Sequence, residues 1–390
     1  MLLVVALVLG LGSVAMAGAT AGRASPEERR ERMAAVLAVM GALVTGFGVI
    51  LFFAANWSDI PRWLRVASLI AGMALLYGLG YYLREVRRTN LHVAHALIFL
   101  GTVLFGASLF LVGQMYHVQA HDPLGFLIWA IGCLLVAALV RSGPIAALGL
   151  LVLVAWIAHE VIDLAGAVEE TAVLLPVVLT LFGVALYGLG TGASRWSAPL
   201  RFERPMRMIG FALVALGVFP FTFRLVHQSG FLGRDPLTLT EAKVLFWGFA
   251  AAALVGSVVL ALQFRVRRTS LAEAVVLAAA GLLVVLAVVA PEVGETGGEF
   301  TGDEATVYPL LFNALLAVLA VGAIVVGFLN DEVWLANAGV VWVGIDVIAR
   351  FFDPSWSMLE RSLVLIPAGL VAIAAGYLLE RRRQMPGVAA

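Results

Sequence analysis

Long apolar runs recur along the whole sequence and restrict the chain to one broad class of fold. A helix of about 20 apolar residues crosses the hydrocarbon core of a bilayer. The runs that reach or approach this length lie at residues 2–22, 33–55, 64–83, 91–113, 124–140, 143–162, 171–192, 208–226, 244–264, 271–290, 307–328, 332–350 and 362–380. Charged residues make up 13% of the chain, against about 25% in soluble domains. The sequence therefore predicts an all-α, polytopic transmembrane helix bundle with a span at each of these runs.

Short polar segments separate the runs, so we expect consecutive spans to pair as helical hairpins in series. The even-numbered runs from the second onward begin 52 to 65 residues apart, which is the length of one hairpin. The shortest divider, between the fifth and sixth runs, is Arg141-Ser142-Gly143-Pro144. Proline disfavours helix at the residue before it, so Pro144 favours a break there.

Basic residues alternate between the two sides of this predicted map. Membrane proteins keep an excess of Lys and Arg in their cytoplasmic loops. The loops after odd-numbered spans, with the C-terminal tail, hold 18 of the 25 basic residues: Arg23, Arg29, Arg30, Arg32, Arg84, Arg87, Arg88, Arg141, Arg195, Arg201, Arg204, Arg207, Arg265, Arg267, Arg268, Arg381, Arg382 and Arg383. This distribution predicts an N-terminus outside the cell and a C-terminus in the cytoplasm.

The first apolar run has more than one interpretation. It reads MLLVVALVLGLGSVAMAGATA, and Ala15-Met16-Ala17 has the pattern of a signal-peptide cleavage site. No basic segment precedes the run, and the basic stretch RASPEERRER follows it. Cleavage would leave that stretch outside, against the charge rule. We favour an uncleaved anchor span over a signal peptide or a misassigned start codon.

Charge and cysteine content exclude several classes of function. The formal net charge is +0, so no overall field would attract nucleic acid. The single cysteine, Cys133, lies in an apolar run, which excludes an internal disulfide and disfavours cysteine-based metal or redox chemistry. No Walker motif, G-x-S-x-G or H-E-x-x-H is present, and we expect no cofactor.

The basic residues are almost all arginine, with Lys243 the single lysine. This bias, together with abundant Ala, Gly and Val, is associated with GC-rich bacterial genomes. The expected location is therefore the bacterial inner (cytoplasmic) membrane, with the lipid bilayer as the main partner.

Residues 113–123, GQMYHVQAHDP, form a polar stretch at the predicted outer end of the fourth span. If the helix continues, Gln114, His117 and His121 share one face. His117 and His121 also have a zinc-ligand spacing, and Asp122 adds a carboxylate. However, no glutamate lies between the histidines, and Asp122 precedes Pro123, which disfavours helix there. We favour interfacial histidines bonded to loop backbone over a pH-responsive cluster or a metal site.

Two further stretches contribute to the predicted outer face. His159, in HEVID (159–163), either ends a helix or joins His117 and His121 in one outer pocket. Asn56 and Trp57, in NWSDIPRWLR, follow the second span, and we favour a structural anchoring role for them.

Arg224 lies in GVFPFTFRLVH (217–227), the best candidate for a broken helix. Pro220 removes a backbone hydrogen bond within the eighth span. Arg224 then either extends to the outer headgroups or binds an anionic lipid or sugar-phosphate. We favour the first interpretation.

Two stretches together resemble a known family: FGVILFFAANWSDIPRWLR (47–65) and GTVLFGASLFLVGQMYHVQA (101–120). The matching pieces are Ala55-Asn56-Trp57 with Ile60-Pro61, and Gly106-Ala107-Ser108 followed by Gly113-Gln114 and Tyr116-His117. They resemble the bacterial DUF2157 family of predicted multi-pass membrane proteins, most strongly over residues 33–140. The resemblance implies a helical membrane region there and no particular activity. Family members often begin with a soluble helical segment, whereas this chain begins with an apolar span.

The sequence thus predicts three regions: an anchor span and basic cytoplasmic linker (1–32), a DUF2157-like four-helix region (33–140) and further transmembrane helices (141–390). The leading hypothesis is a non-enzymatic envelope protein that binds or moves a lipid-like or anionic solute through an outward-facing polar pocket. The candidate binding residues are Gln114, His117, His121, Asp122, Asn56, Trp57, His159 and Arg224. The alternatives are a membrane-embedded metal-dependent enzyme using His117, His121 and Asp122, and a structural or assembly partner of another envelope protein.

Overall fold

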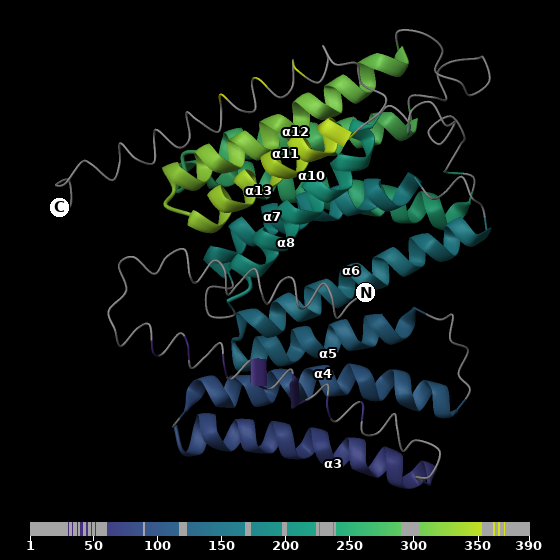
Figure 1. Cartoon of the computed structure of the whole chain (residues 1–390), viewed down its shortest axis with the longest axis vertical. Coiled ribbons are helices and arrows are strands. Elements are labelled where there is room, and N and C mark those ends of the chain that lie inside the picture. The colour runs from purple at the N-terminus through teal and green to yellow at the C-terminus, as the bar shows by residue number, and fades with distance from the viewer. Residues whose placement is uncertain are drawn as a thin grey trace, which may run out of the picture. The chain divides into compact units, whose positions relative to one another are not determined.

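The computed structural model describes residues 61–88, 90–116, 123–167, 173–196, 201–223, 239–289 and 304–352, with isolated positions elsewhere. These ranges contain helices and no strand, which confirms the predicted all-α fold (Figure 1). The α-helices are α3 (Arg62–Tyr81), α4 (Leu91–Met115), α5 (Leu124–Val140), α6 (Gly143–Ala167), α7 (Leu174–Trp196), α8 (Glu203–Val218), α10 (Thr240–Ala261), α11 (Ser270–Val289), α12 (Glu304–Leu329) and α13 (Val333–Phe352). Single helical turns extend three of them: η1 (Tyr82–Val86) after α3, η4 (Phe219–Thr222) after α8 and η5 (Leu262–Arg265) after α10.

Helix length and composition agree with a membrane protein. Within the described residues, 9 helices are long and apolar enough to cross a membrane, and the apolar helix Leu124–Val140 is shorter. The predicted spans from 64–83 to 332–350 therefore coincide with helices. Predicted spans 2–22, 33–55 and 362–380 lie outside the described residues, apart from isolated positions. The count of thirteen stays a prediction.

The break expected near Pro144 is present. Helix α5 ends at Val140, and Arg141 has a φ of 54° and a ψ of 48°, a left-handed conformation that terminates the helix. Pro144 is the second residue of α6. An N–H at this position has no partner inside the helix, so proline is tolerated there without loss of a hydrogen bond. Two residues are therefore enough to separate two antiparallel helices.

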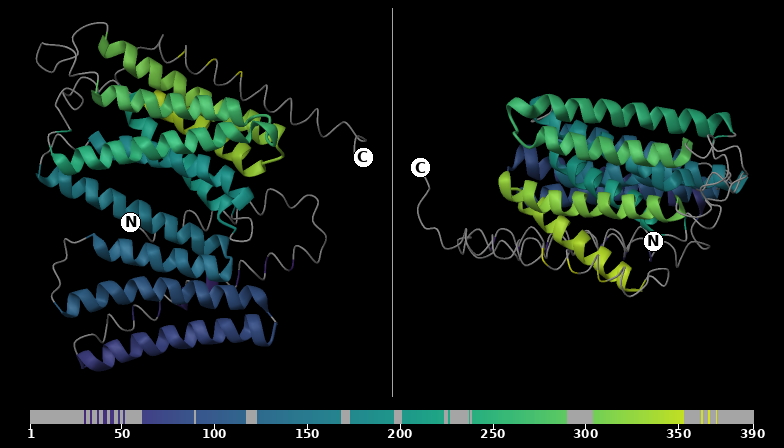
Figure 2. Two further views of the ribbon diagram at one scale, coloured as in Figure 1. Left: turned by 180° about the vertical axis from the view of Figure 1, so that it is seen from behind. Right: turned by 90° about the horizontal axis from the view of Figure 1, so that it is seen from above.

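The chain divides into two compact units, Met1–Trp156 and Ile157–Ala390. In the first unit, α3, α4, α5 and the start of α6 follow one another as adjacent helices (Figures 1 and 2). Large aromatic side chains pack against glycines of α4. The Trp129 ring lies against Gly106, and the Tyr77 ring lies against Gly101. Trp129 Nε1 also donates a 3.0 Å hydrogen bond to the Thr102 carbonyl. Glycines in α4 thus allow the aromatic side chains of α3 and α5 to pack closely.

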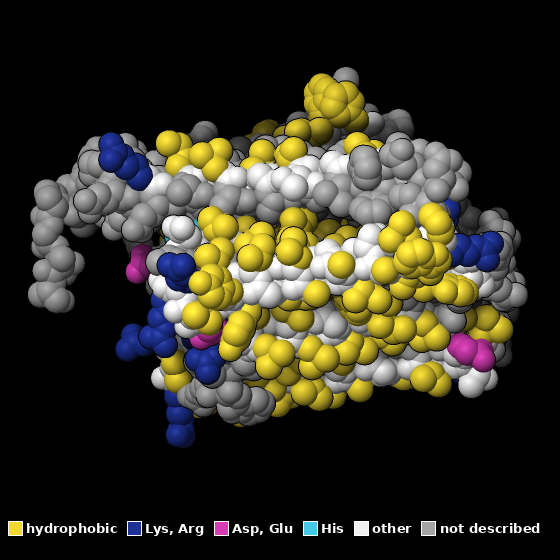
Figure 3. Space-filling view, turned by 90° about the horizontal axis from the view of Figure 1, so that it is seen from below, with side chains coloured by type: hydrophobic (Ala, Val, Ile, Leu, Met, Phe, Trp, Pro, Cys, Tyr) yellow, Lys and Arg dark blue, Asp and Glu magenta, His cyan; other side chains and the backbone are white. Residues whose placement is uncertain are grey.

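The exposed side of α3 is largely apolar, as a lipid-facing surface requires. Trp63, Ile70, Leu75 and Leu79 of α3 are 71%, 57%, 61% and 44% exposed. Figure 3 views this side of the molecule, where hydrophobic side chains cover the middle and Lys and Arg lie toward the two ends. Basic side chains at the ends of an apolar band suit the headgroup regions of a bilayer.

In the second unit, α7 is the central helix, and the adjacent helices approach it at glycines. A Cβ atom added to Gly188 would collide with the Gly256 backbone of α10, and one added to Gly210 of α8 would lie 2.7 Å from the Gly183 carbonyl oxygen. Small residues allow such close backbone approach between membrane helices, where van der Waals packing drives association. Figure 2 shows the helices α10 to α13, coloured green to yellow, alongside one another around this core.

At one end of the second unit, the α-helix ends close to Pro220, where the sequence predicts a broken helix. Helix α8 gives way to η4, and Phe223 is extended. The freed Thr222 carbonyl accepts hydrogen bonds from Asn313 Nδ2 at 2.9 Å and from Arg350 Nη1 at 3.1 Å. Arg350, on α13, is fully buried and also donates to Thr222 Oγ1 at 2.7 Å. The broken helix therefore supplies the acceptors for a buried guanidinium.

Candidate functional site

A cluster of charged and polar side chains lies at the other end of the second unit. It combines the C-terminal half of α7, the first turns of α8 and α11, the segment after η5 and the loop between α12 and α13. We call it the ion network, and its members are Tyr187, Arg207, Arg267, Thr269, Glu273, Asn330 and Glu332. Because consecutive helices are antiparallel, these segments meet although they are far apart in sequence.

Two arginines hold Glu332. Arg207 Nη1 donates to Glu332 Oε1 at 2.6 Å, and Arg207 Nη2 donates to Oε2. Arg267 Nη1 donates to Oε1 at 2.7 Å, and its Nη2 donates to Oε2 at 3.2 Å. Each carboxylate oxygen therefore accepts from both guanidinium groups, a bidentate geometry that favours strong charge-assisted hydrogen bonds.

Glu273 is the second carboxylate of the network, and it is buried. Arg267 Nε donates to its Oε1 at 2.7 Å, and Tyr187 Oη donates to its Oε2 at 2.7 Å. Thr269 Oγ1 also donates to Oε1 at 2.6 Å, and Asn330 Nδ2 donates to Thr269 Oγ1 at 2.9 Å. Arg267 thus bridges the two glutamates.

Arg207 is 4% exposed, so its charge depends on the network. Its guanidinium carbon lies 5.3 Å from the Tyr187 ring centroid and 5.4 Å from that of Trp334, within the range of a cation–π interaction. Among the described residues, however, its buried Nε has no hydrogen-bond acceptor. The guanidinium therefore stacks on two rings and keeps one donor without a partner in the described part of the chain.

The network keeps its loop residues charged. Burial acts to raise the pKa of Glu332, but hydrogen bonds from Arg207 and Arg267 outweigh it and hold that pKa below its ordinary value. Burial likewise acts to lower the pKa of Arg267, and its hydrogen bonds to Glu332 and Glu273 raise that pKa above its ordinary value. The carboxylate and the guanidinium each stabilise the ionised form of the other.

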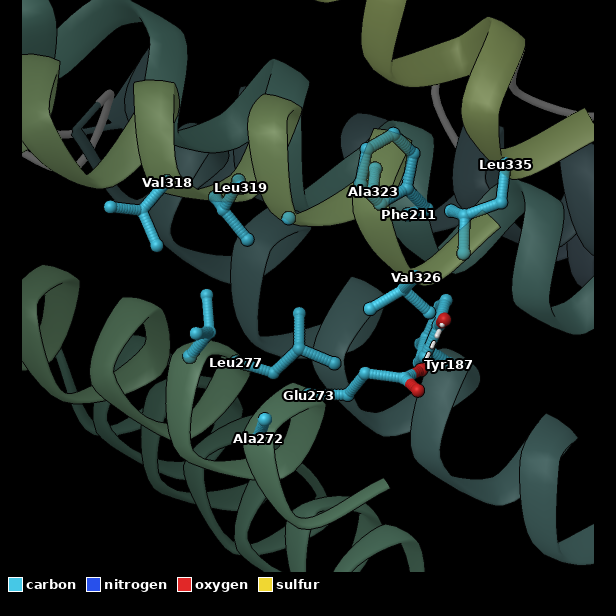
Figure 4. A pocket seen from close by; sticks show the side chains of 12 residues that line it. Tyr187, Phe211, Ala272, Glu273, Leu277, Val318, Leu319, Ala323, Val326 and Leu335 are labelled. Carbon is cyan, nitrogen blue, oxygen red and sulfur yellow. Dashed lines mark hydrogen bonds between the residues drawn. The ribbon is translucent and has the colours of Figure 1, made fainter. Parts of the chain in front are cut away.

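Two cavities adjoin the network. The first, of about 120 Å³, is lined by Tyr187, Phe211, Ala272, Glu273, Val276, Leu277, Val318, Leu319, Gly322, Ala323, Val326 and Leu335. Figure 4 shows the Tyr187–Glu273 hydrogen bond at one end of this apolar cavity and Val318 toward the other. The second cavity, of about 250 Å³, is polar, and it is lined by Thr191, Glu203, Arg207, Gln263, Val266, Arg267, Asn330 and Glu332.

The apolar cavity reaches the outside of the helix bundle between α11 and α12. Val318 is 50% exposed and Ala272 is also exposed, although both line it. A Cβ atom added to Gly322 would meet no heavy atom within 4 Å. The cavity is therefore open on the side of α12 that carries Gly322 and Val318.

The structure describes two of the eight candidate residues predicted from the sequence. Gln114 is exposed in the last turn of α4, and His159 is exposed in α6. The other six, His117, His121, Asp122, Asn56, Trp57 and Arg224, lie outside the described residues. The part of the chain that is described contains no group of three or more His, Cys, Asp or Glu side chains that could hold a metal ion. The outer pocket and the metal site stay predictions.

Sequence reasoning missed the ion network. It treated Arg207 and Arg267 as cytoplasmic loop charges, yet both are held by carboxylates. Glu273 and Glu332, each at or near the start of a predicted span, were the available signals, because a carboxylate there lies on an otherwise basic side of the membrane. The partners could not be paired from sequence, since Arg207 and Glu332 are 125 residues apart.

Comparison with known protein families finds a match for the N-terminal third of the chain. Residues 12–146 match the DUF2157 family, whose members are described as predicted membrane proteins. The resemblance expected from the sequence is thereby confirmed, and the DUF2157 match extends beyond residues 33–140 at both ends. No curated protein and no solved structure matches the chain. The ion network and both cavities lie outside the DUF2157 match, in the second unit.

Proposed function

We propose that this membrane protein binds a lipid-like, anionic molecule within the second unit. The observation that carries the proposal is the apolar cavity of about 120 Å³ that ends at Tyr187 and Glu273, because these two residues hydrogen-bond to Arg207 and Arg267 of the polar cavity. An amphipathic molecule needs this combination, because its chain is stabilised by apolar walls and its charged group by guanidinium donors.

The open side of the cavity supports entry from the bilayer. The exposed positions of Val318 and Ala272 would face lipid tails if α11 and α12 cross the membrane, so a chain could enter sideways without crossing water. The arginine distribution favours a cytoplasmic location for the ion network. Binding there differs from the outward-facing pocket predicted around His117 and His121, which would be a separate site.

Filling the cavity tests the proposal. Gly322→Leu projects a side chain into the open space beside Gly322. Gly344→Leu is the matched control, because a Cβ at Gly344 of α13 also meets nothing within 4 Å and this residue does not line the cavity. Protein purified in a neutral detergent would be assayed for dodecanol and dodecyl phosphate binding by calorimetry, and for co-purified lipid by mass spectrometry.

We expect Gly322→Leu to weaken binding of both dodecyl probes by about tenfold, since a blocked cavity loses the burial of several CH₂ groups. Gly344→Leu should bind as the unmodified protein does. Equal binding by all three proteins would contradict the proposal, as would the absence of both co-purified lipid and probe binding.

A further inference from the structure

The arginines of the ion network surround Glu332 as they would surround a ligand anion. Arg207 and Arg267 each present two Nη donors to the same carboxylate, at 2.6 to 3.2 Å for the three longer bonds. Paired guanidinium forks recognise carboxylate and phosphate groups with similar geometry. Glu332 therefore occupies a position that is also suited to the charged group of a bound molecule.

The two arginines line the polar cavity and hydrogen-bond to residues that line the apolar one. Arg207 and Arg267 line the polar cavity, and they also reach the residues that end the apolar one: Arg207 Nη2 donates to Tyr187 Oη at 3.4 Å, and Arg267 Nε donates to Glu273 Oε1 at 2.7 Å. Tyr187 and Glu273 line the apolar cavity. The network thus forms the connection between an apolar compartment and a polar one.

Glu332 is the member of the ion network that is best placed to move away from the two arginines. It lies in the short loop between α12 and α13, and its side chain is 18% exposed, against 5% for Arg207 and 7% for Glu273. Rotation of its side chain toward its exposed side would free both guanidiniums. Arg207 and Arg267 would then carry two positive charges against the single negative charge of Glu273.

A buried charge without a partner is unfavourable in free energy, so Arg207 and Arg267 would favour binding of another anion once Glu332 has moved. The buried Arg207 Nε, which has no acceptor among the described residues, is a further donor available to an anion with more than two oxygens. Glu203 lies 3.9 Å from Arg207 Nη1 and is 43% exposed, so it would only partly offset the charge.

We propose that Arg207 and Arg267 form an anion gate, in which a phosphate or carboxylate group displaces Glu332 and joins the two cavities. This inference deepens the proposed function and rests on it for the apolar part of the ligand. The resting state is closed, because Glu332 acts as an internal competitor for the arginines. A ligand that carries both a chain and an anionic group opens it.

The test compares Glu332→Gln with the unmodified protein. Glutamine keeps the size of the side chain and removes the competing charge, so affinity for an anion should rise. We expect Glu332→Gln to bind dodecyl phosphate about tenfold more tightly, since charged hydrogen bonds no longer have to be exchanged. Dodecanol affinity should not change. Arg267→Gln in the Glu332→Gln background should remove the gain, and Asp331→Asn, in the same loop, is the charge-matched control.

Inorganic phosphate separates two sources of the anion. If Glu332→Gln gains affinity for inorganic phosphate as well, the gate accepts a free anion; if the gain is confined to dodecyl phosphate, it accepts a lipid headgroup. Both results support an anion gate. Unchanged or weaker binding of dodecyl phosphate by a Glu332→Gln protein with normal helix content and elution volume would overturn it. The proposed function would survive that result, because it depends on dodecanol binding and on the Gly322→Leu variant.

Discussion

Tyr187 Oη donates a 2.7 Å hydrogen bond to Glu273 Oε2, although the two residues are 86 positions apart. The bond joins α7 to α11 at the end of the apolar cavity, and Arg267 holds the same carboxylate from the other side. A buried carboxylate is stable only when its oxygens are satisfied. The geometry therefore links the apolar cavity to the ion network through two side chains, Tyr187 and Glu273.

Removing the Tyr187 hydroxyl should weaken the ion network without creating a cavity in the core. Tyr187→Phe keeps the ring that stacks with Arg207 and leaves Glu273 with one donor fewer. We expect a loss of about 1–2 kcal/mol in unfolding free energy, as for other buried hydrogen bonds to charged groups. Thermal unfolding in detergent, followed by circular dichroism, measures it. Tyr77→Phe, whose ring packs on Gly101, is the control and should change little.

Acid should weaken the second unit through Glu332. The pKa of Glu332 in the folded protein is held below its ordinary value of 4.5, so the ionised carboxylate stabilises the folded state. That contribution is fully present above the ordinary pKa and is lost as pH falls through the lower, folded-state pKa. Melting temperatures between neutral pH and about pH 3 should fall more steeply for the unmodified protein than for Glu332→Gln. Parallel curves for the two proteins would argue against a stabilising role for the carboxylate charge.

Arg350 should be necessary for the fold around Pro220. Its guanidinium satisfies Thr222, lies 3.4 Å from Asp346 Oδ1 through Nε and stacks 4.3 Å from the Phe223 ring centroid. Arg350→Met would leave the half-buried Asp346 carboxylate without its cation and the Thr222 acceptors without their donor, at a cost on the order of 2 kcal/mol. Folded yield and melting temperature would both decline. Pairing it with Asp346→Asn should recover part of the loss, and no recovery would mean that the Thr222 contacts dominate.

Two glycines on one helix should respond differently to the same substitution. A Cβ at Gly256 would lie 2.7 Å from the Ala185 Cα atom of α7, whereas one at Gly248 would meet nothing within 4 Å. Gly256→Val should therefore cost about 1–3 kcal/mol by overpacking, and Gly248→Val should be tolerated. Size-exclusion profiles before and after heating distinguish them. Equal tolerance would show that α7 and α10 are not held at glycine contact.

Orientation in the membrane can be measured with fusions. If the arginine-rich ends are cytoplasmic, alkaline phosphatase joined after Arg268 should be inactive and the same enzyme joined after Gly297 should be active. These two sites flank α11, so they should lie on opposite sides. The reverse pattern would invert the predicted topology and move the ion network to the outer side.

Much of the architecture follows from the order of apolar and polar residues. A run of about 20 apolar residues has no stable alternative to a helix in a bilayer, because its backbone must satisfy its own hydrogen bonds. Proline disfavours helix at the residue before it and removes a backbone N–H, so the boundary near Arg141 and Pro144 and the end of the α-helix near Pro220 could also be predicted from sequence. The DUF2157 resemblance was equally local, since it depends on contiguous motifs.

Pairing between distant side chains was decided only by tertiary structure. The sequence predicted Arg207 and Arg267 as cytoplasmic loop charges and gave no partner for Arg350, because sequence position indicates depth in the membrane and not the neighbour on the next helix. The fold brings Arg207 and Arg267 to Glu332 and buries Arg350 against Thr222. A charge is stabilised in an apolar interior only by specific partners, and those partners exist only after the helices have packed. The sequence by itself determined the helices, and the packing determined which charges meet.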